Sequence, residues 1–239
     1  MRAHHAQVAD VIQFSWVDGP GNRFVLFLQG CNFNCLACHN PQTIPLQTPR
    51  AKDYSVEEVL TKIRESLPYI TGVTVSGGEA TVQHEFLFDL FAAIKAAPDL
   101  KQLTTFIDSN GNAEKHIWEV LLPVTDGVML DLKVLDNERH IALTTQSNTA
   151  VLETIKYLAS RGKLYEVRLL LIPGQNDSDE ELRKTAQWLL RADPSVRVKI
   201  NAFMSHGVRA SARTWAEVSD EDRLRYSQIM TEEGILDLV

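Results

Sequence analysis

The 239-residue sequence has little cysteine, no excess of basic residues and no long apolar run. Its 24 lysines and arginines are outnumbered by 31 aspartates and glutamates, which gives a formal net charge of −7. General nucleic-acid binding needs a basic surface and is therefore not expected. No apolar run approaches the ~20 residues that cross a bilayer, and the first ten residues lack the apolar core of a signal peptide. We expect a cytoplasmic protein that binds neither nucleic acid nor membranes.

Segments of strand and helix character alternate along the chain, without an internal repeat or a low-complexity stretch. Strands are predicted at 23–29, 72–76, 103–108, 127–133, 165–173 and 196–203. Helices are predicted at 55–67, 83–97, 113–122, about 148–160, 178–192 and 219–234. The first of these helices opens with Ser55 and has Glu58 three residues later, which is the pattern of a capping box.

This alternation predicts an α/β protein with a parallel sheet and right-handed crossovers. Apolar runs such as "LLLI" (169–172) are typical of strands covered on both faces. Because six strand–helix units are fewer than the eight of a closed barrel, we predict an incomplete (β/α)6 barrel of parallel strands, as one domain over residues 1–239. A flat, doubly wound sheet is the alternative. In both folds the functional end lies at the carboxyl ends of the strands, where this sequence places its polar motifs.

All three cysteines lie within eight residues of one loop, "GCNFNCLACHN" (30–40). Reduced cysteines clustered in this way indicate a metal or iron–sulfur site. A four-iron cluster usually has four thiolate ligands, so Cys31, Cys35 and Cys38 would leave one iron open to another molecule. The alternative is a zinc site completed by His39 or a distant histidine. Zinc sites usually complete a set of four ligands, and adjacent Cys38 and His39 would chelate one ion awkwardly.

Six segments in the same order carry a resemblance to a known family. They are "DGPGNRFVLFLQGC", "CNFNCLACHN", "VTVSGGEA", "DSNG", "VMLDLK" and "VRLLLIPGQND", spread over about residues 18–177. With these segments the sequence resembles the radical S-adenosylmethionine (radical SAM) enzymes, and within them the activases of glycyl radical enzymes. The cysteine spacing is typical of the superfamily, and "DGPG" followed by "CHN" is more specific to the activases.

The resemblance implies a reaction. Cys31, Cys35 and Cys38 ligate a 4Fe–4S cluster, whose open iron binds S-adenosylmethionine. One electron cleaves this cosubstrate to methionine and a 5′-deoxyadenosyl radical, which abstracts hydrogen from a glycine of a partner glycyl radical enzyme. No catalytic side chain is expected beyond the cluster and the cosubstrate. Because no cysteine lies between Cys38 and Gly77, we expect one cluster, reduced by an external flavodoxin or ferredoxin.

The resemblance also implies which residues bind S-adenosylmethionine: Ala37, His39, Asn40, Gly77, Gly78, Glu79, Asp131, Lys133, Arg168 and His206. Taken alone, two glycines let a ligand approach the backbone closely, but "GGE" also suits an ordinary turn with a glutamate at a helix start. Arg168 lies in an apolar strand and needs a partner, so an ion pair with an acid of a neighbouring strand is the alternative. His206 follows Phe203 and Met204, which occupy the positions of a Tyr-His pair in the family. An exposed loop histidine is the alternative there.

Two acidic residues end neighbouring predicted strands, and such a pair repels unless a cation lies between the carboxylates. The resemblance implies a sodium or potassium ion, bound by Asp108, Ser109, the carbonyl of Met129 and Asp131. The family more often has threonine in place of Ser109. Alternatively, Asp108 starts an Asx turn and Asp131 caps a helix. The resemblance places the turn at Asp18 and Gly19 against the protein substrate.

Two other functions remain as alternatives to the activase. One is a radical SAM enzyme with a small-molecule substrate, such as a carboxy-deazaguanine synthase. The other is a zinc-stabilised binding module without catalysis.

Overall fold

The computed structural model describes residues 5–239, in two compact parts. The first part holds the described residues up to 32 together with 42–109 and 113–129, and the second holds 33–41, 110–112 and 130–239. Strand β6 (Gly127–Asp131) begins in the first part and ends in the second. The single domain over residues 1–239 stays a prediction, and residues 1–4 lie outside the described range.

The first part contains a sheet of mixed direction. Its strands are β1 (His5–Ser15), β2 (Arg23–Leu28), β3 (Lys52–Ser55), β4 (Gly72–Gly77) and β5 (Thr104–Ser109), in the order β3-β1-β2-β4-β5 with β6 next. Strands β2, β4 and β5 are parallel, as predicted. The antiparallel strands β1 and β3 were not predicted and form the edge of this sheet. The motif "GC" comes shortly after β2, and "SGGE" begins at the end of the neighbouring parallel strand β4.

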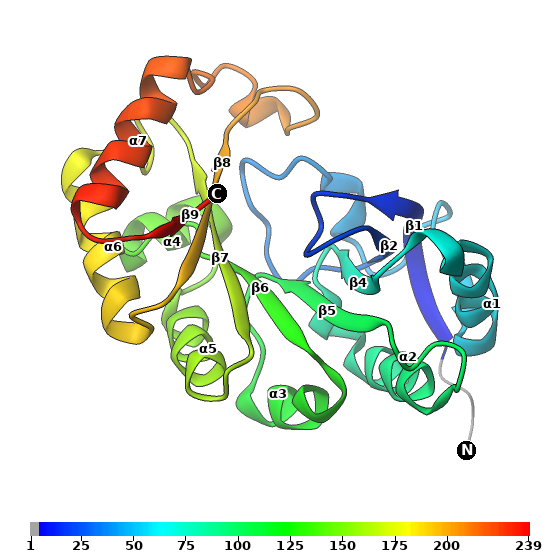
Figure 1. The fold of residues 1–239 in the computed structure, drawn as a ribbon. Helices are drawn as coiled ribbons and strands as arrows, with labels where there is room; N and C mark the ends of the chain where they lie inside the picture. Colours follow the sequence, from blue (N-terminus) through cyan, green and yellow to red (C-terminus); the bar gives the residue numbers. More distant parts are fainter. Residues whose placement is uncertain (1–4) are drawn as a thin grey trace. The chain divides into compact units, whose positions relative to one another are not determined.

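Helices cover the strands of the first part (Figure 1). They are α1 (Val56–Ser66), α2 (His84–Ala96) and α3 (Lys115–Leu121), with short 3-10 turns η1 (Pro41–Thr43), η2 (Leu67–Tyr69), η3 (Ala80–Gln83) and η4 (Leu122–Val124). The predicted capping box is confirmed, since Ser55 accepts from the Glu58 amide and Glu58 accepts from the Ser55 amide. Helix α1 packs on β1 and α2, and α2 packs on α3.

The second part contains parallel strands β7 (Leu164–Leu171), β8 (Arg197–Ala202) and β9 (Asp237–Leu238), which follow β6 in the strand order. Its helices are α4 (Asn137–Thr144), α5 (Thr149–Ser160), α6 (Asp179–Ala192) and α7 (Asp220–Glu232), with the 3-10 turn η5 (Ala210–Ala212). Helix α4 was not predicted. It is capped by Asp136, whose Oδ1 accepts from the Arg139 amide, and ends at Thr145 in the left-handed conformation.

All six predicted strands are present, within two residues at each end. The fold is α/β with a mostly parallel sheet that is open rather than closed, since the strand order begins at β3 and ends at β9. None of the described helices is both long and apolar enough to span a membrane.

Candidate functional site

The first cysteine follows directly on the end of β2, where Gly30 turns the chain. Gly30 has φ +99°, a conformation that favours glycine. The Gly30 amide donates to Thr43 O at 2.8 Å and the Cys31 amide donates to Ile44 O at 3.0 Å. Cys31 is thus held by its backbone; it forms no disulfide and is partly exposed.

The two glycines of "SGGE" pack against this same stretch of backbone. The Gly78 amide donates to Leu28 O at 2.9 Å, and the Glu79 amide donates to Gly30 O at 2.8 Å. A Cβ on Gly77 would lie 2.1 Å from Leu28 O, and a Cβ on Gly78 would lie 2.2 Å from Gly30 O. The chain's own backbone therefore lies close to these glycines and ties the end of β4 to the start of the cysteine loop. The approach of a ligand to them stays a prediction.

Glu79 is buried and uses one carboxylate oxygen inside the first part. Its Oε1 accepts from the amide and hydroxyl of Thr81, at 2.9 and 2.6 Å, and from the Ser109 hydroxyl at 2.8 Å. These bonds make Glu79 the N-cap of η3. The helix-start alternative for Glu79 is thus confirmed, and its contact with S-adenosylmethionine stays a prediction.

The remaining predicted residues of the first part lie on β5, on β6 and in the turn before β2. Asp108 accepts from the Ser76 hydroxyl at 2.9 Å, and Met129 is fully buried. Asp18 accepts from the Ser15 hydroxyl at 2.5 Å, and its carbonyl accepts from the Thr74 hydroxyl at 2.7 Å. Gly19, with φ +125°, completes this turn.

The second part holds the other two cysteines, in a tight turn. The Cys38 amide donates to Cys35 O at 3.3 Å, and both thiols are free and partly exposed. Burial raises the pKa of the Cys35 thiol, and the positive charge of Lys133 opposes that rise. A thiol must lose its proton to bind a metal. The positive charge of Lys133 therefore favours the deprotonated form of Cys35.

Lys133 and Asp131 form a contact at the end of β6, with Nζ 2.7 Å from Oδ2. The two side chains, two residues apart, therefore lie on the same side of the chain. The helix-capping alternative for Asp131 is wrong, because the next helix is capped by Asp136. Lys133 is also held by its backbone, since its carbonyl accepts from the buried Asn176 side chain at 2.6 Å. Sequence reasoning missed Asn176, although it lies in the matched segment "PGQND".

Arg168 is buried, and its Nε donates to Glu166 Oε1 at 2.8 Å. Arg197 approaches the other oxygen of Glu166 at 3.4 Å. The alternative reading of Arg168 expected an acid on a neighbouring strand, but Glu166 lies on the same strand two residues earlier. Alternation along a strand places such residues on one face, which is the signal that could have identified the pair.

The histidines of the second part have different surroundings. The Nε2 of His39 lies 3.0 Å from Met204 O, and its ring approaches Phe203. His206 is exposed on the same loop. Of the neighbouring residues, Ala37 is buried in an apolar cluster, and Asn40 is exposed.

The chemistry of the donors fits an iron–sulfur cluster, because all three cysteines are partly exposed and none forms a disulfide. Cys31 belongs to the first part and Cys35 and Cys38 to the second. Within residues 5–239, no three His, Cys, Asp or Glu side chains gather as ligands of a single metal ion.

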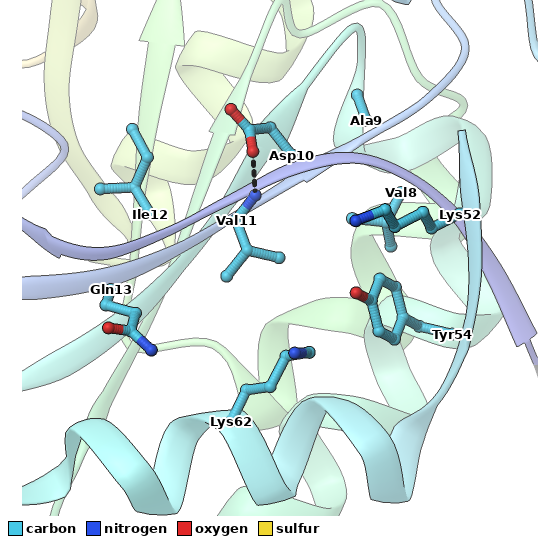
Figure 2. A pocket seen from close by; sticks show the side chains of 9 residues that line it. All are labelled: Val8, Ala9, Asp10, Val11, Ile12, Gln13, Lys52, Tyr54 and Lys62. Carbon is cyan, nitrogen blue, oxygen red and sulfur yellow. Dashed lines mark hydrogen bonds between the residues drawn. The ribbon is translucent and has the colours of Figure 1, made fainter. Parts of the chain in front are cut away.

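A cavity of about 530 Å³ lies in the first part between β1, β3 and α1. Figure 2 shows Tyr54 and Lys62 pointing into it, while Asp10 turns back to accept from the Val11 amide at 2.8 Å. None of the predicted site residues lines this cavity. It is separate from the candidate site.

Comparisons with known proteins agree with these features. The radical SAM superfamily matches residues 25–189. A Haemophilus influenzae protein, provisionally named a glycyl-radical enzyme activating enzyme, is 37% identical over 84% of this chain and 83% of its own length. The pyruvate formate-lyase-activating enzyme of Streptococcus mutans is 38% identical, over 81% of this chain and 76% of its own. Streptococcus suis SuiB, solved with S-adenosylmethionine, has a TM-score of 0.65 at 17% identity, covering 85% of this chain and 45% of that one.

The chain belongs to the radical SAM superfamily and, within it, to the glycyl-radical-enzyme activating enzymes. The likeness to SuiB concerns the fold, which is the open α/β fold described above.

Proposed function

We propose that this enzyme binds one 4Fe–4S cluster through Cys31, Cys35 and Cys38, cleaves S-adenosylmethionine reductively, and removes hydrogen from a glycine of a partner glycyl radical enzyme. The observation that carries the proposal is the set of three cysteines at C-x3-C-x2-C spacing, none of which forms a disulfide, in a chain whose relatives are named as activating enzymes. The enzyme works in the cytoplasm, where thiols stay reduced. Reduced flavodoxin or ferredoxin supplies the electron.

When bound, the cluster supplies the electron that breaks the sulfonium bond of S-adenosylmethionine. The protein's part is to hold and orient that cosubstrate. The backbone of Gly77 and Gly78 and the carboxylate of Glu79 receive its amino group, while Lys133 and Arg168 supply positive charge to its carboxylate. Ala37, His39, Asn40, Asp131 and His206 complete the contacts. The pairing of Lys133 with Asp131 and of Arg168 with Glu166 supports this role, because a paired cation keeps its position.

A monovalent cation, sodium or potassium, belongs to the same proposal. Its ligands are Asp108, Ser109, the carbonyl of Met129 and Asp131. Carboxylate, hydroxyl and carbonyl oxygens suit such a hard cation.

The protein substrate approaches the turn at Asp18 and Gly19. Two hydrogen bonds to Asp18, from Ser15 and Thr74, support this assignment because they fix the shape of the turn. Specificity is commonly carried by such loops on a rigid sheet.

The test combines the anaerobically reconstituted enzyme, a chemical reductant, S-adenosylmethionine and a glycyl radical enzyme encoded beside its gene. We expect a doublet glycyl signal in electron paramagnetic resonance that collapses to a singlet in deuterated solvent if the glycine hydrogen exchanges. A small metabolite that stimulates 5′-deoxyadenosine formation, with no glycyl signal from any partner, would instead support a small-molecule enzyme. Stoichiometric zinc without iron would reject both.

A further inference from the structure

The segment of residues 33–40, which carries Cys35 and Cys38, is held at its first turn by the end of α4. The Asn34 amide donates to Thr144 O at 3.0 Å, and the Leu36 amide donates to Leu143 O at 2.9 Å. These bonds fix the backbone on both sides of Cys35. They leave Asn34 exposed at the surface of the second part.

The loop of residues 203–218, which follows β8, holds the same segment from another side. Arg209 Nη2 donates to Asn34 Oδ1, next to Cys35. His39 Nε2 donates to Met204 O at 3.0 Å, next to Cys38, because a carbonyl can only accept. Gly207 lies so close to His39 O that a Cβ there would be 3.3 Å away. The loop therefore contacts Asn34, which precedes Cys35, and His39, which follows Cys38.

Between the two cysteines, an apolar contact adds to these polar ones. Ala37 is 6% exposed and lies in a buried cluster with Ile172, Phe203, Val208 and Ala212. Three of those four partners belong to the 203–218 loop. The methyl group of Ala37 is thus seated in a surface that this loop builds.

The 203–218 loop has its own internal bracing. The Ser205 amide and hydroxyl both donate to Glu217 Oε1, at 2.8 and 2.6 Å. The Val218 amide donates to Phe203 O at 3.2 Å, which closes the loop at its base. Trp215 packs on Phe203. A braced loop of this kind can impose a conformation on the segment that it contacts.

We infer that the 203–218 loop positions the 33–40 segment for cluster binding, with Arg209 as the positioning residue for Cys35 through Asn34. Fixing a flexible segment costs about 1–2 kcal/mol per residue. Contacts that already order the segment in the metal-free protein reduce the entropy lost when the cluster binds. Cys35 and Cys38 are then already in position. The consequence for the cluster rests on the proposed function. The consequence for the segment does not, because it applies equally to the metal-free protein.

The experiment compares Arg209→Met, Asn34→Ala and the double variant by hydrogen–deuterium exchange of the full-length, metal-free protein. We expect amides of residues 34–39 to exchange about ten-fold faster in each single variant, which is what losing one charge-assisted hydrogen bond would produce. The double variant should exchange no faster than the single ones, since both remove the same contact. Arg213→Met is the matched control: it removes an equal charge from the same loop, where Arg213 donates to Val208 O at 3.4 Å, which lies within the loop.

The second readout is the rate at which the reconstituted protein loses iron to a chelator. We expect this rate to rise about ten-fold in Arg209→Met and to stay unchanged in Arg213→Met. Unchanged exchange in both Asn34→Ala and Arg209→Met, or equal effects of Arg209→Met and Arg213→Met, would overturn the inference. A wild-type protein that binds zinc and no iron would overturn the proposed function, while the exchange measurement would still decide the role of the loop.

Discussion

The backbones of Gly78 and Gly30 are in direct contact, so that a Cβ on Gly78 would lie 2.2 Å from Gly30 O. This contact joins the loop after β4 to the residue that precedes Cys31. Two backbone hydrogen bonds, from Gly78 to Leu28 and from Glu79 to Gly30, reinforce it. The position of the first cysteine therefore depends on a glycine 47 residues later in the chain.

We predict that Gly78→Ala destabilises the protein by about 1–3 kcal/mol, because the added methyl group forces backbone apart. Urea unfolding measures the change. Gly162→Ala is the control: it meets nothing within 4 Å, although its φ of +63° alone costs about 1 kcal/mol. If the Gly78 variant is no less stable than wild type, the backbone contact is not as close as described.

Replacing any one cysteine by alanine should abolish the intact cluster and the cleavage of S-adenosylmethionine, because each thiolate anchors one iron. Iron content, the visible spectrum and 5′-deoxyadenosine formation measure this outcome. The control is Ser160→Ala, a hydroxyl that is exposed at the end of α5. A Cys35→Ala protein with a full four-iron spectrum and normal cleavage would refute the ligand assignment.

Asp131→Ala should weaken S-adenosylmethionine binding about ten-fold or more while changing the unfolding free energy less. The carboxylate holds the ammonium of Lys133 at 2.7 Å, and both groups are proposed to face the cosubstrate. Equilibrium dialysis measures the affinity for S-adenosylmethionine, and repeating it with and without sodium or potassium tests whether Asp131 acts through a bound cation. Equal affinities of wild type and variant in all buffers would show that the pair serves only the fold.

Much of the scaffold could be predicted from sequence because its signals are local. Continuous apolar runs identified six strands, and Ser55 with Glu58 identified the start of α1. The glycines of "SGGE" were read as a place where a ligand approaches the backbone, which stays a prediction. What approaches them is the backbone at the end of β2, and such a partner is set by the strand order rather than by any local pattern.

The missed features depend on contacts between distant residues. Strand β1 pairs antiparallel with β2 and β3 at the edge of the sheet. The alternation of strands and helices along the sequence predicts only parallel strands, so it did not reveal β1. The contact of His39 with Met204 joins residues 165 apart. The alternative reading of Arg168 placed its acidic partner on a neighbouring strand, whereas Glu166, which accepts from it, lies on its own strand.

Glu166→Gln should destabilise the protein by about 3 kcal/mol or more, because it leaves the Arg168 guanidinium without its carboxylate in a buried position. Chemical denaturation measures the loss. Glu180→Gln removes an exposed partner of Lys184 and should cost about 0.5 kcal/mol or less. Similar midpoints for the two variants would mean that Arg168 does not depend on Glu166.

His140 should make the metal-free protein less stable as the pH falls below the ordinary range of histidine. The side chain is fully buried on α4, where Nδ1 donates to Gln146 O at 2.7 Å and the ring meets the edge of Phe33. Burial lowers the pKa of His140, and the positive charge of Lys133 lowers it further, against the opposing effect of the bond to Gln146. The Nε2 atom has no hydrogen-bond partner among the described residues, so a second proton would enter an unfavourable site.

The unfolded chain therefore binds a proton at His140 at a higher pH than the folded chain does. Stability from this residue is fully present above the unfolded pKa of about 6.5 and is lost as the pH falls through that value towards the lower folded pKa. Urea midpoints measured from about pH 7.5 down to about pH 5.5 should fall in wild type and fall less in His140→Gln. Ser160→Ala, at an exposed hydroxyl that carries no charge, should keep the wild-type slope. A His140→Gln slope equal to that of wild type would show that His140 is protonated as easily in the folded protein as in the unfolded chain.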